Sequence, residues 1–274
     1  MALGIVVAGF GIGSLIFAPL INYLILSRSW RMAYLIIGFI FFVVISLSAL
    51  VIKRSQTESS TVTQTNPLNS IRVRSWTAGR AMLTLPFAGI TLIHCFVLVS
   101  MQTMAVHLVP YATDVGISST VSAAAVGLLG GFSVPGRLLS GFVSERIQWQ
   151  RTLALSCFGM SLVLLFLFFL KGAWMLYCFV FFYGMFHGAR VSAHLGILGQ
   201  FFGIGSLGEL IGITEAIGIF IGSLAPYLTG YVFDTSGSYS MAFLIVMALL
   251  LLSAITASVI GKPIAPYKPR HTGL

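Results

Sequence analysis

Several ionisable side chains stand inside long apolar stretches of this sequence, where they could hold an anion or pass a proton. Arg137, Arg190 and Glu215 lie in three different stretches of this kind. A planar guanidinium can hold a carboxylate through two parallel hydrogen bonds, whereas carboxylates and imidazoles can take up and release protons. Placing such a group in hydrocarbon costs about 2.5–3.5 kcal/mol, so each of the three is a candidate functional residue.

The neighbours of Arg137 favour a polar cavity on one side of its helix. At helical spacing, Ser122, Gly130, Ser133 and Gly141 share the face of Arg137, and all of them are small. We therefore expect Arg137 and Ser133 to be substrate-binding residues. The alternative is that Arg137 extends its side chain to the membrane surface or braces the turn that follows it.

A second group of ionisable residues comes from two apolar stretches, 173–200 and 207–232. His187, Arg190 and His194 follow one another at spacings of three and four, so they share one helix face, and Glu215 enters its own stretch to a comparable depth. An ion pair between Arg190 and Glu215 is geometrically reasonable. This pair has two possible interpretations. It could be a purely structural buried ion pair, or it could have a role linked to protons or substrate.

A third pattern is a polar stripe in the stretch 81–109 and just after it. Ser100, Thr103, His107 and Tyr111 recur at helical spacing and could line the same cavity, which makes His107 and Tyr111 candidate substrate-binding residues. The alternative is that the proline just before Tyr111 marks the helix end. His94 falls on another face and is interpreted as a packing residue.

The composition places these residues in a membrane protein. Of 274 residues, 58% are apolar and only 8% are charged, against roughly 45–50% and about 25% in soluble domains. So few charges cannot cover a soluble protein, whereas a lipid-facing surface suits the apolar excess. The net charge of +9 is typical of basic cytoplasmic loops, and no basic stretch is interleaved with aromatics, so nucleic acid is not an expected partner.

The elements that must position the candidate residues are predicted to be helices. A transmembrane helix needs about 20 mostly apolar residues, and strands are several times shorter than the stretches found here. The prediction is an all-α integral membrane protein with eight transmembrane helices. They cover residues 2–26, 32–52, 81–109, 118–143, 152–170, 173–200, 207–232 and 239–261.

The charges and polar residues between the helices predict the orientation. The segment 53–80 is rich in Ser, Thr, Gln and Asn, which is typical of a linker. Lys and Arg concentrate in this linker, near the turn at residue 144 and in the C-terminal tail. Because basic residues favour the cytoplasmic side, both termini and the linker are predicted to be cytoplasmic in a multi-pass protein of the cell (inner) membrane.

Four motifs resemble the major facilitator superfamily. The run from Gly136 to Arg146 resembles the signature that follows its second or eighth helix, and would make Gly141, Glu145 and Arg146 a gating turn. The residues His107 to Ser118 resemble the end of helix seven in the bacterial monocarboxylate and oxalate/formate branch. The other two motifs are Ala225 to Tyr239, similar to the helix eleven to twelve corner, and Pro19-Leu20 with Trp30-Arg31, similar to the helix five to six corner.

The resemblance implies a partial fold that runs from helix five to helix twelve. Residues 1–52 would be the last two helices of the N-terminal half, and 53–80 the cytoplasmic linker. Residues 81–262 would be a complete C-terminal six-helix half, followed by the tail 263–274. Helices one to four are expected to be missing. The turn departs from the family pattern, because Gln, Trp and Gln stand where Gly and basic residues are usual.

The function that the resemblance implies is secondary transport of a small organic anion, for example a monocarboxylate, by alternating access. The arginine of helix eight in monocarboxylate-type carriers meets the substrate carboxylate, and Arg137 matches that position. Transport would be symport or antiport driven by an ion gradient, with Glu215, His187 or His194 coupling it to protons. Oxalate-type members carry a lysine in helix eleven, and 207–232 has none, which weakens a dicarboxylate as substrate.

Two rival interpretations remain. The missing helices favour a membrane remnant or interaction protein that does not transport. A membrane-embedded enzyme has less support, because neither H-E-x-x-H, G-x-S-x-G nor a P-loop pattern occurs. The three cysteines lie in apolar stretches without a C-x-x-C spacing, so no metal site or cofactor is predicted.

Overall fold

The computed structural model describes residues 76–261 and, before them, residues 27–51 and isolated positions between 13 and 25. The predicted first helix therefore lies mostly outside the described residues, as do nearly all of the linker and the tail. The chain divides into two compact units, one of residues 16–73 and one of residues 1–15 with 74–274, and each is described by itself.

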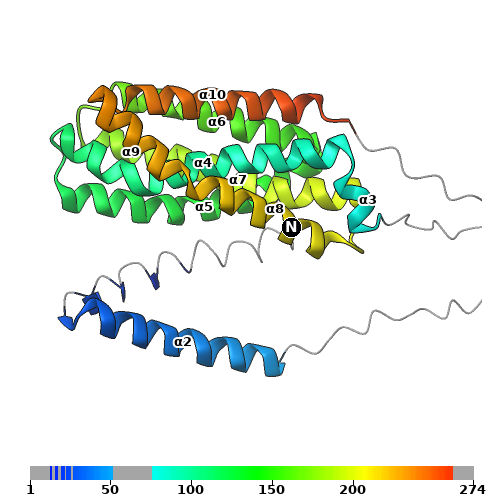
Figure 1. Ribbon diagram of the computed structural model, residues 1–274, viewed down its shortest axis with the longest axis horizontal. Helices are drawn as coiled ribbons and strands as arrows, with labels where there is room; N and C mark the ends of the chain where they lie inside the picture. Colours follow the sequence, from blue (N-terminus) through cyan, green and yellow to red (C-terminus); the bar gives the residue numbers. More distant parts are fainter. Residues whose placement is uncertain are drawn as a thin grey trace, which may run out of the picture. The chain divides into compact units, whose positions relative to one another are not determined.

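The smaller unit contains the helix α2, Trp30–Val51 (Figure 1). Its 22 residues span about 33 Å at 1.5 Å per residue, which matches the thickness of the hydrocarbon core of a bilayer. The guanidinium of Arg31 lies 5.1 Å from the ring centre of Trp30 at the start of the helix. Aromatic and basic residues at this position are typical of a membrane interface.

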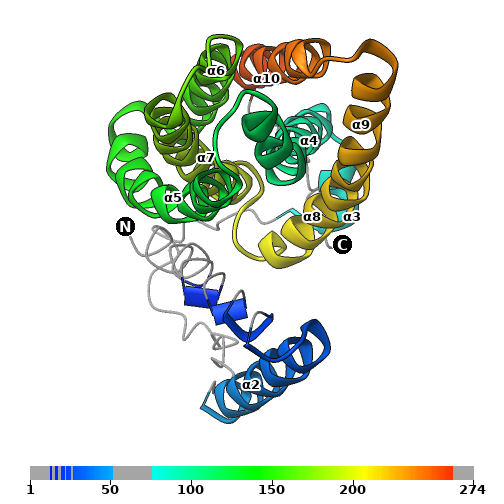
Figure 2. The ribbon, with the colours of Figure 1, turned by 90° about the vertical axis from the view of Figure 1, so that its left-hand side faces the viewer.

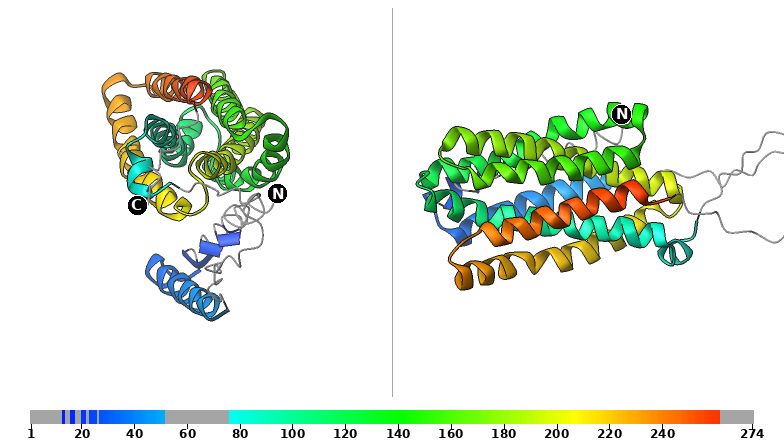
Figure 3. Two further views of the ribbon diagram at one scale, coloured as in Figure 1. Left: turned by 90° about the vertical axis from the view of Figure 1, so that its right-hand side faces the viewer. Right: turned by 90° about the horizontal axis from the view of Figure 1, so that it is seen from above.

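All regular secondary structure among the described residues of the larger unit is helical, which confirms the all-α prediction. Figures 1 and 2 show its long helices running side by side, and Figure 3 shows the same bundle from two further directions. α5 and α6 both pack on α7, while α4 packs on α8 and α10. The elements are α3 (Ala78–Met82), α4 (Leu85–Asp114), α5 (Ser119–Ile147), α6 (Trp149–Phe168), α7 (Ala173–Phe202), α8 (Leu207–Ser223), α9 (Ala225–Ser236) and α10 (Ser240–Val259).

Six helices among the described residues are long and apolar enough to cross a membrane. The prediction of eight transmembrane helices is therefore not confirmed. They are α2, α4, α5, α6, the continuous pair α8 and α9, and α10. α7 is 30 residues long, but it carries His187, Arg190 and His194 among its buried residues and is therefore less apolar. Since α7 packs between α5 and α6, this polarity faces protein rather than lipid.

Local sequence signals fix several helix ends. Thr84 accepts a hydrogen bond from the backbone nitrogen of Phe87 at the start of α4, and Ser118 caps α5 in the same way. α4 continues past Pro110 to Asp114, so this proline lies within the helix rather than at its end. The predicted stretch 207–232 breaks at Leu224 into α8 and α9, just before Pro226, which has no backbone donor.

Glycines allow α5 and α7 to approach each other closely. A Cβ atom on Gly188 would lie 1.9 Å from the carbonyl oxygen of Ser133, and one on Gly136 would lie 2.0 Å from that of Met185. Gly184 is in similar contact with α5, so small residues at these positions let the two helices pack closely. This contact sets the distance between the two helices that carry Arg137 and Arg190.

Gly188→Ala is expected to destabilise the protein by about 1–3 kcal/mol, because the added methyl group meets backbone that cannot move aside. Thermal unfolding of the purified protein in detergent measures the effect. Gly208→Ala is the matched control, since a Cβ atom there meets nothing within 4 Å. Equal melting temperatures for the two variants would contradict the close contact.

Candidate functional site

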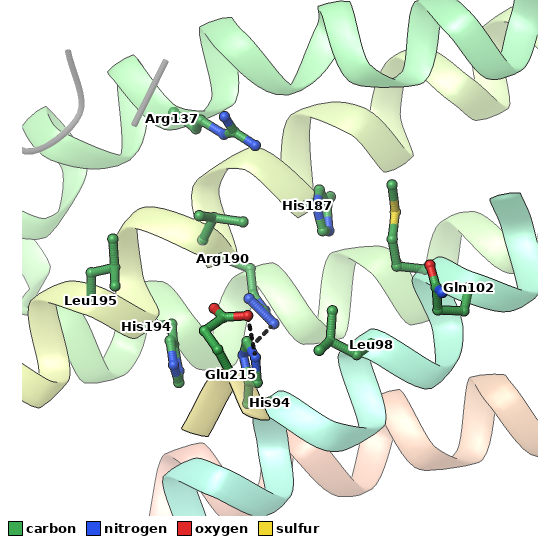
Figure 4. Close-up of a pocket in the computed structure, with 11 residues that line it drawn as sticks. His94, Leu98, Gln102, Arg137, His187, Arg190, His194, Leu195 and Glu215 are labelled. Atoms are coloured by element: carbon green, nitrogen blue, oxygen red, sulfur yellow. Dashed lines mark hydrogen bonds and ion pairs between the residues drawn. The ribbon is translucent and has the colours of Figure 1, made fainter. Parts of the chain in front are cut away.

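A cavity of about 610 Å³ lies among α4, α5, α7 and α8. Its volume is within the range of about 300–1,000 Å³ that is typical of small-molecule sites. Figure 4 shows side chains from all four helices turned toward it. The ionisable groups that line it are His94, Arg137, His187, Arg190, His194 and Glu215.

His94 of α4 lies at the centre of the polar contacts. Its Nδ1 accepts a hydrogen bond from Nη2 of Arg190 at 2.9 Å, and its Nε2 lies 3.3 Å from Oε2 of Glu215 (Figure 4). A guanidinium can only donate, so Nδ1 must be unprotonated and the imidazole proton is on Nε2, facing the carboxylate. The three residues form a chain from a cation through a neutral ring to an anion.

His194 lies against this chain. Its ring stacks on that of His94 with 4.4 Å between the centres and 22° between the planes. Its Nε2 lies 3.4 Å from the hydroxyl of Thr214, which donates its own proton to the carbonyl of Ile211. The hydroxyl therefore accepts from His194, which places a proton on Nε2 of that ring.

Three buried polar atoms that α7 brings to the cavity have no hydrogen-bond partner among the described residues. They are Nε of Arg190, Nδ1 of His187 and Nδ1 of His194. Leaving such a group unsatisfied costs about 1–3 kcal/mol, and more when it is charged. The arrangement therefore suits a polar ligand that brings both acceptors and donors.

Arg137 reaches the cavity from α5. The residue is 3% exposed and lines the cavity, so its side chain does not extend to the membrane surface. Its carbonyl oxygen accepts hydrogen bonds from Ser140 on its own helix and from Ser192 on α7, which fixes the position of its backbone. Ser133 turns its hydroxyl to the carbonyl of Gly130 and packs against α7.

The expectation of a direct ion pair between Arg190 and Glu215 was wrong. In the described part of the chain each of them contacts His94 instead. His94 is buried, as expected of a packing residue, and it also makes these two polar contacts. The reason is the close approach of α8 to α4 at Gly218, where a Cβ atom would lie 2.4 Å from the His94 ring. The face of α4 alone could not reveal this contact, although the glycines of α8 signal a close neighbour.

The polar stripe of α4 joins helices and lies outside the cavity lining. His107 contacts the carbonyl oxygen of Pro226 through its Nε2 at 2.9 Å, and Tyr111 donates to the carbonyl of Leu167. The other two residues of the stripe also make hydrogen bonds between helices. The hydroxyl groups of Ser100 and Tyr183 lie 2.6 Å apart, and those of Thr103 and Thr229 lie 3.3 Å apart. Contact of His107 and Tyr111 with a substrate stays a prediction.

The motif turn lies at the end of α5. Gly141 is buried, whereas Glu145 and Arg146 are exposed. Just after them, the side-chain amide of Gln150 donates to three carbonyl oxygens at the end of α10, at 2.7–3.3 Å. The turn is thus attached to the last helix, and its gating role stays a prediction.

His94, His194 and Glu215 are residue types that bind metal ions, and their ligand atoms lie within 4.8 Å of one another. Zinc at about 2.0–2.1 Å needs lone pairs that converge tetrahedrally. The two rings are stacked nearly parallel, so their in-plane lone pairs do not converge, and Arg190 already donates to Nδ1 of His94. The geometry favours a hydrogen-bonded chain over a metal site.

Comparisons with known proteins agree with this architecture. Residues 1–189 match the sequence profile of the Major Facilitator Superfamily. Monocarboxylate transporter 12 of Rattus norvegicus is 28% identical over 283 residues, which cover 93% of this chain and 58% of that protein. Monocarboxylate transporter 13 of Rattus norvegicus is 25% identical, with 92% of this chain and 57% of that protein covered. The chain thus spans a little over half the length of the curated relatives it matches.

Proposed function

Since the chain belongs to the major facilitator superfamily, we propose that it serves in the secondary active transport of a small organic anion, such as a monocarboxylate. The relatives are named as monocarboxylate transporters, and the described helices fit a multi-pass membrane protein. Transport proceeds by alternating access, in which two helical halves rock about a central site.

The observation that carries this proposal is the pair of buried guanidiniums at one cavity. Arg137 and Arg190 come from different helices, are 3% and 2% exposed, and line the same space. A guanidinium can hold a carboxylate through two parallel hydrogen bonds, and two guanidiniums at one cavity attract an anion. The cavity therefore suits a small organic anion.

The position of the cluster agrees with such a site. Arg190 is near the middle of the 30-residue α7, so it lies close to the centre of a membrane that this helix crosses. Major facilitator sites lie near the midplane between the two halves. Residues 81–262 would form the C-terminal half, and residues 1–52 would belong to the other half.

Reconstitution into liposomes tests the proposal. Vesicles loaded with unlabelled pyruvate, lactate or benzoate are diluted into the labelled anion, and counterflow is measured. We expect labelled anion to accumulate transiently for at least one of the three. Flux no greater than in protein-free vesicles would contradict transport and favour the interaction-protein alternative, whereas chemical conversion of the anion would indicate an enzyme.

The proposed orientation has its own test. Because basic residues surround the linker, residue 62 should face the cytoplasm and residue 115 the outside of the cell membrane. Single cysteines are placed at these positions after Cys95, Cys157 and Cys178 are replaced. An impermeant thiol reagent added to intact cells should label position 115 only, and labelling of position 62 alone would reverse the orientation.

A further inference from the structure

We propose that His94 is the group that takes up a proton in this cavity, and that its protonation releases Arg190 to bind the anion. The inference rests on the proposed function and deepens it, because it names the residue that couples the two ions. Neither the sequence motifs nor the relatives' names assign a role to His94. The hydrogen-bond geometry points to it.

In the first step, a proton on Nδ1 of His94 and an N–H group of Arg190 cannot both occupy the space between the two residues. Nδ1 of His94 now accepts from Arg190 at 2.9 Å. If Nδ1 gains a proton, both ring nitrogens become donors, and an N–H group of Arg190 can no longer point at Nδ1. The guanidinium must therefore leave the ring. It remains charged, and its free donors turn to the cavity that Arg190 already lines.

The second step concerns the proton balance. A hydronium ion from the side with more protons gives its proton to Nδ1 and leaves as water, so one N–H bond forms and one hydrogen bond breaks. The ring becomes an imidazolium whose Nε2–H faces Glu215 at 3.3 Å. The Glu215 carboxylate is then paired with the His94 imidazolium, and the anion that enters pairs with Arg190. One proton and one monovalent anion move together.

The charges around His94 make the two binding events cooperative. From α7 it faces Arg190, His187 and the stacked His194, and from α8 it faces Glu215. Arg137 adds a positive charge from α5 to the same cavity. With the two guanidiniums of Arg190 and Arg137 nearby, a proton on His94 is unfavourable until an anion arrives, so each ligand favours the other.

α10 and α9, which also pack on α4, do not change this balance. α10 has no ionisable side chain between its first and last residues, Ser240 and Val259. α9 contacts α4 at Thr103 and His107, more than two helical turns beyond His94. Glu215 is thus the negative charge that contacts the ring directly among the described residues.

His94→Gln provides the main test, because its amide oxygen can accept from Arg190 but takes up no proton at working pH. In liposomes, wild-type protein should accumulate labelled pyruvate about tenfold for a gradient of one pH unit, if one proton accompanies each anion. The variant should retain pyruvate counterflow but lose this accumulation. Thr91→Val, one turn earlier on α4, removes a buried hydroxyl outside the cavity and should behave like wild type.

Accumulation by His94→Gln equal to that of the wild type would overturn the role of His94 and leave the transport proposal intact. Absence of pyruvate, lactate and benzoate counterflow in the wild type would instead contradict transport itself. His94→Asn is the second variant if the glutamine variant does not insert.

A measurement on the wild-type protein needs no transport. Nitrogen NMR of ¹⁵N-histidine-labelled protein should show His94 with its proton on Nε2, and with a second proton on Nδ1 once benzoate is added at the same pH. A resting His94 with its proton on Nδ1 would overturn the proposal, whatever the flux. So would a ring that stays neutral when benzoate is bound.

Discussion

Arg137→Lys should reduce uptake of a monocarboxylate at subsaturating concentration by about tenfold to a hundredfold. Lysine keeps the charge but cannot make two parallel hydrogen bonds to one carboxylate. A hydrogen bond to a charged group contributes about 1.5–3 kcal/mol, and each 1.4 kcal/mol is a factor of ten. Initial rates of labelled pyruvate uptake into liposomes measure the loss, after protein amounts have been equalised.

Arg151→Lys is the matched control for this prediction. Arg151 is exposed near the start of α6 and lies outside the lining of the main cavity, so the same exchange there should leave uptake unchanged. If Arg137→Lys takes up pyruvate as fast as the wild type, bidentate binding of the carboxylate at Arg137 is refuted. An equal loss in both variants would point to a general effect of the substitution rather than to the site.

Glu215→Gln should abolish pH-driven accumulation while anion exchange continues. Without the carboxylate, a protonated His94 would stand between cations with no negative partner on α8. The variant should also unfold more readily, because Arg190 loses its compensating charge. The loss will be smaller than the about 3–5 kcal/mol of a fully buried pair, because the Glu215 side chain is 42% exposed.

Glu209→Gln removes the same charge from the first turn of the same helix, at an exposed position outside the cavity lining. It should retain both exchange and accumulation. Unchanged accumulation in well-folded Glu215→Gln would remove Glu215 from the mechanism. Comparison of the two variants by the same uptake assay and the same unfolding assay separates coupling from stability.

The helices of the larger unit could be predicted from apolar length, since every stretch from residue 81 onward corresponds to one helix, except 207–232, which corresponds to α8 and α9. Their ends were harder to predict. α4 continues through Pro110, whereas Pro226 stands in the first turn of α9, a position that favours proline. A proline in the sequence therefore does not by itself say whether a helix ends, continues or begins there.

The residues of the cavity illustrate what a single sequence can reveal. Arg137, Arg190 and Glu215 stand out because charge is costly in an apolar stretch, and all three line one cavity. His94 does not stand out, because a helix face shows only which residues share that helix. Its importance comes from the approach of α8 at Gly218, a contact between segments more than 100 residues apart.

The stripe of α4 shows the opposite case. His107 and Tyr111 have a spacing as regular as that of the α7 residues, yet both contact backbone carbonyls of other helices. Helical spacing predicts a shared face but does not say whether that face meets a cavity or a neighbour. The stripe makes hydrogen bonds to neighbouring helices, and its contact with a substrate stays a prediction.

The central claim is that an organic anion binds between Arg137 and Arg190, and a structure with 4-iodobenzoate bound tests it most directly. The anomalous signal of iodine locates the ligand independently of the protein. The account predicts the iodine in the cavity among α4, α5, α7 and α8, with the carboxylate about 2.7–2.9 Å from a guanidinium nitrogen of Arg137 or Arg190. A saturating ligand found elsewhere, with Arg190 still hydrogen-bonded to His94, would contradict it.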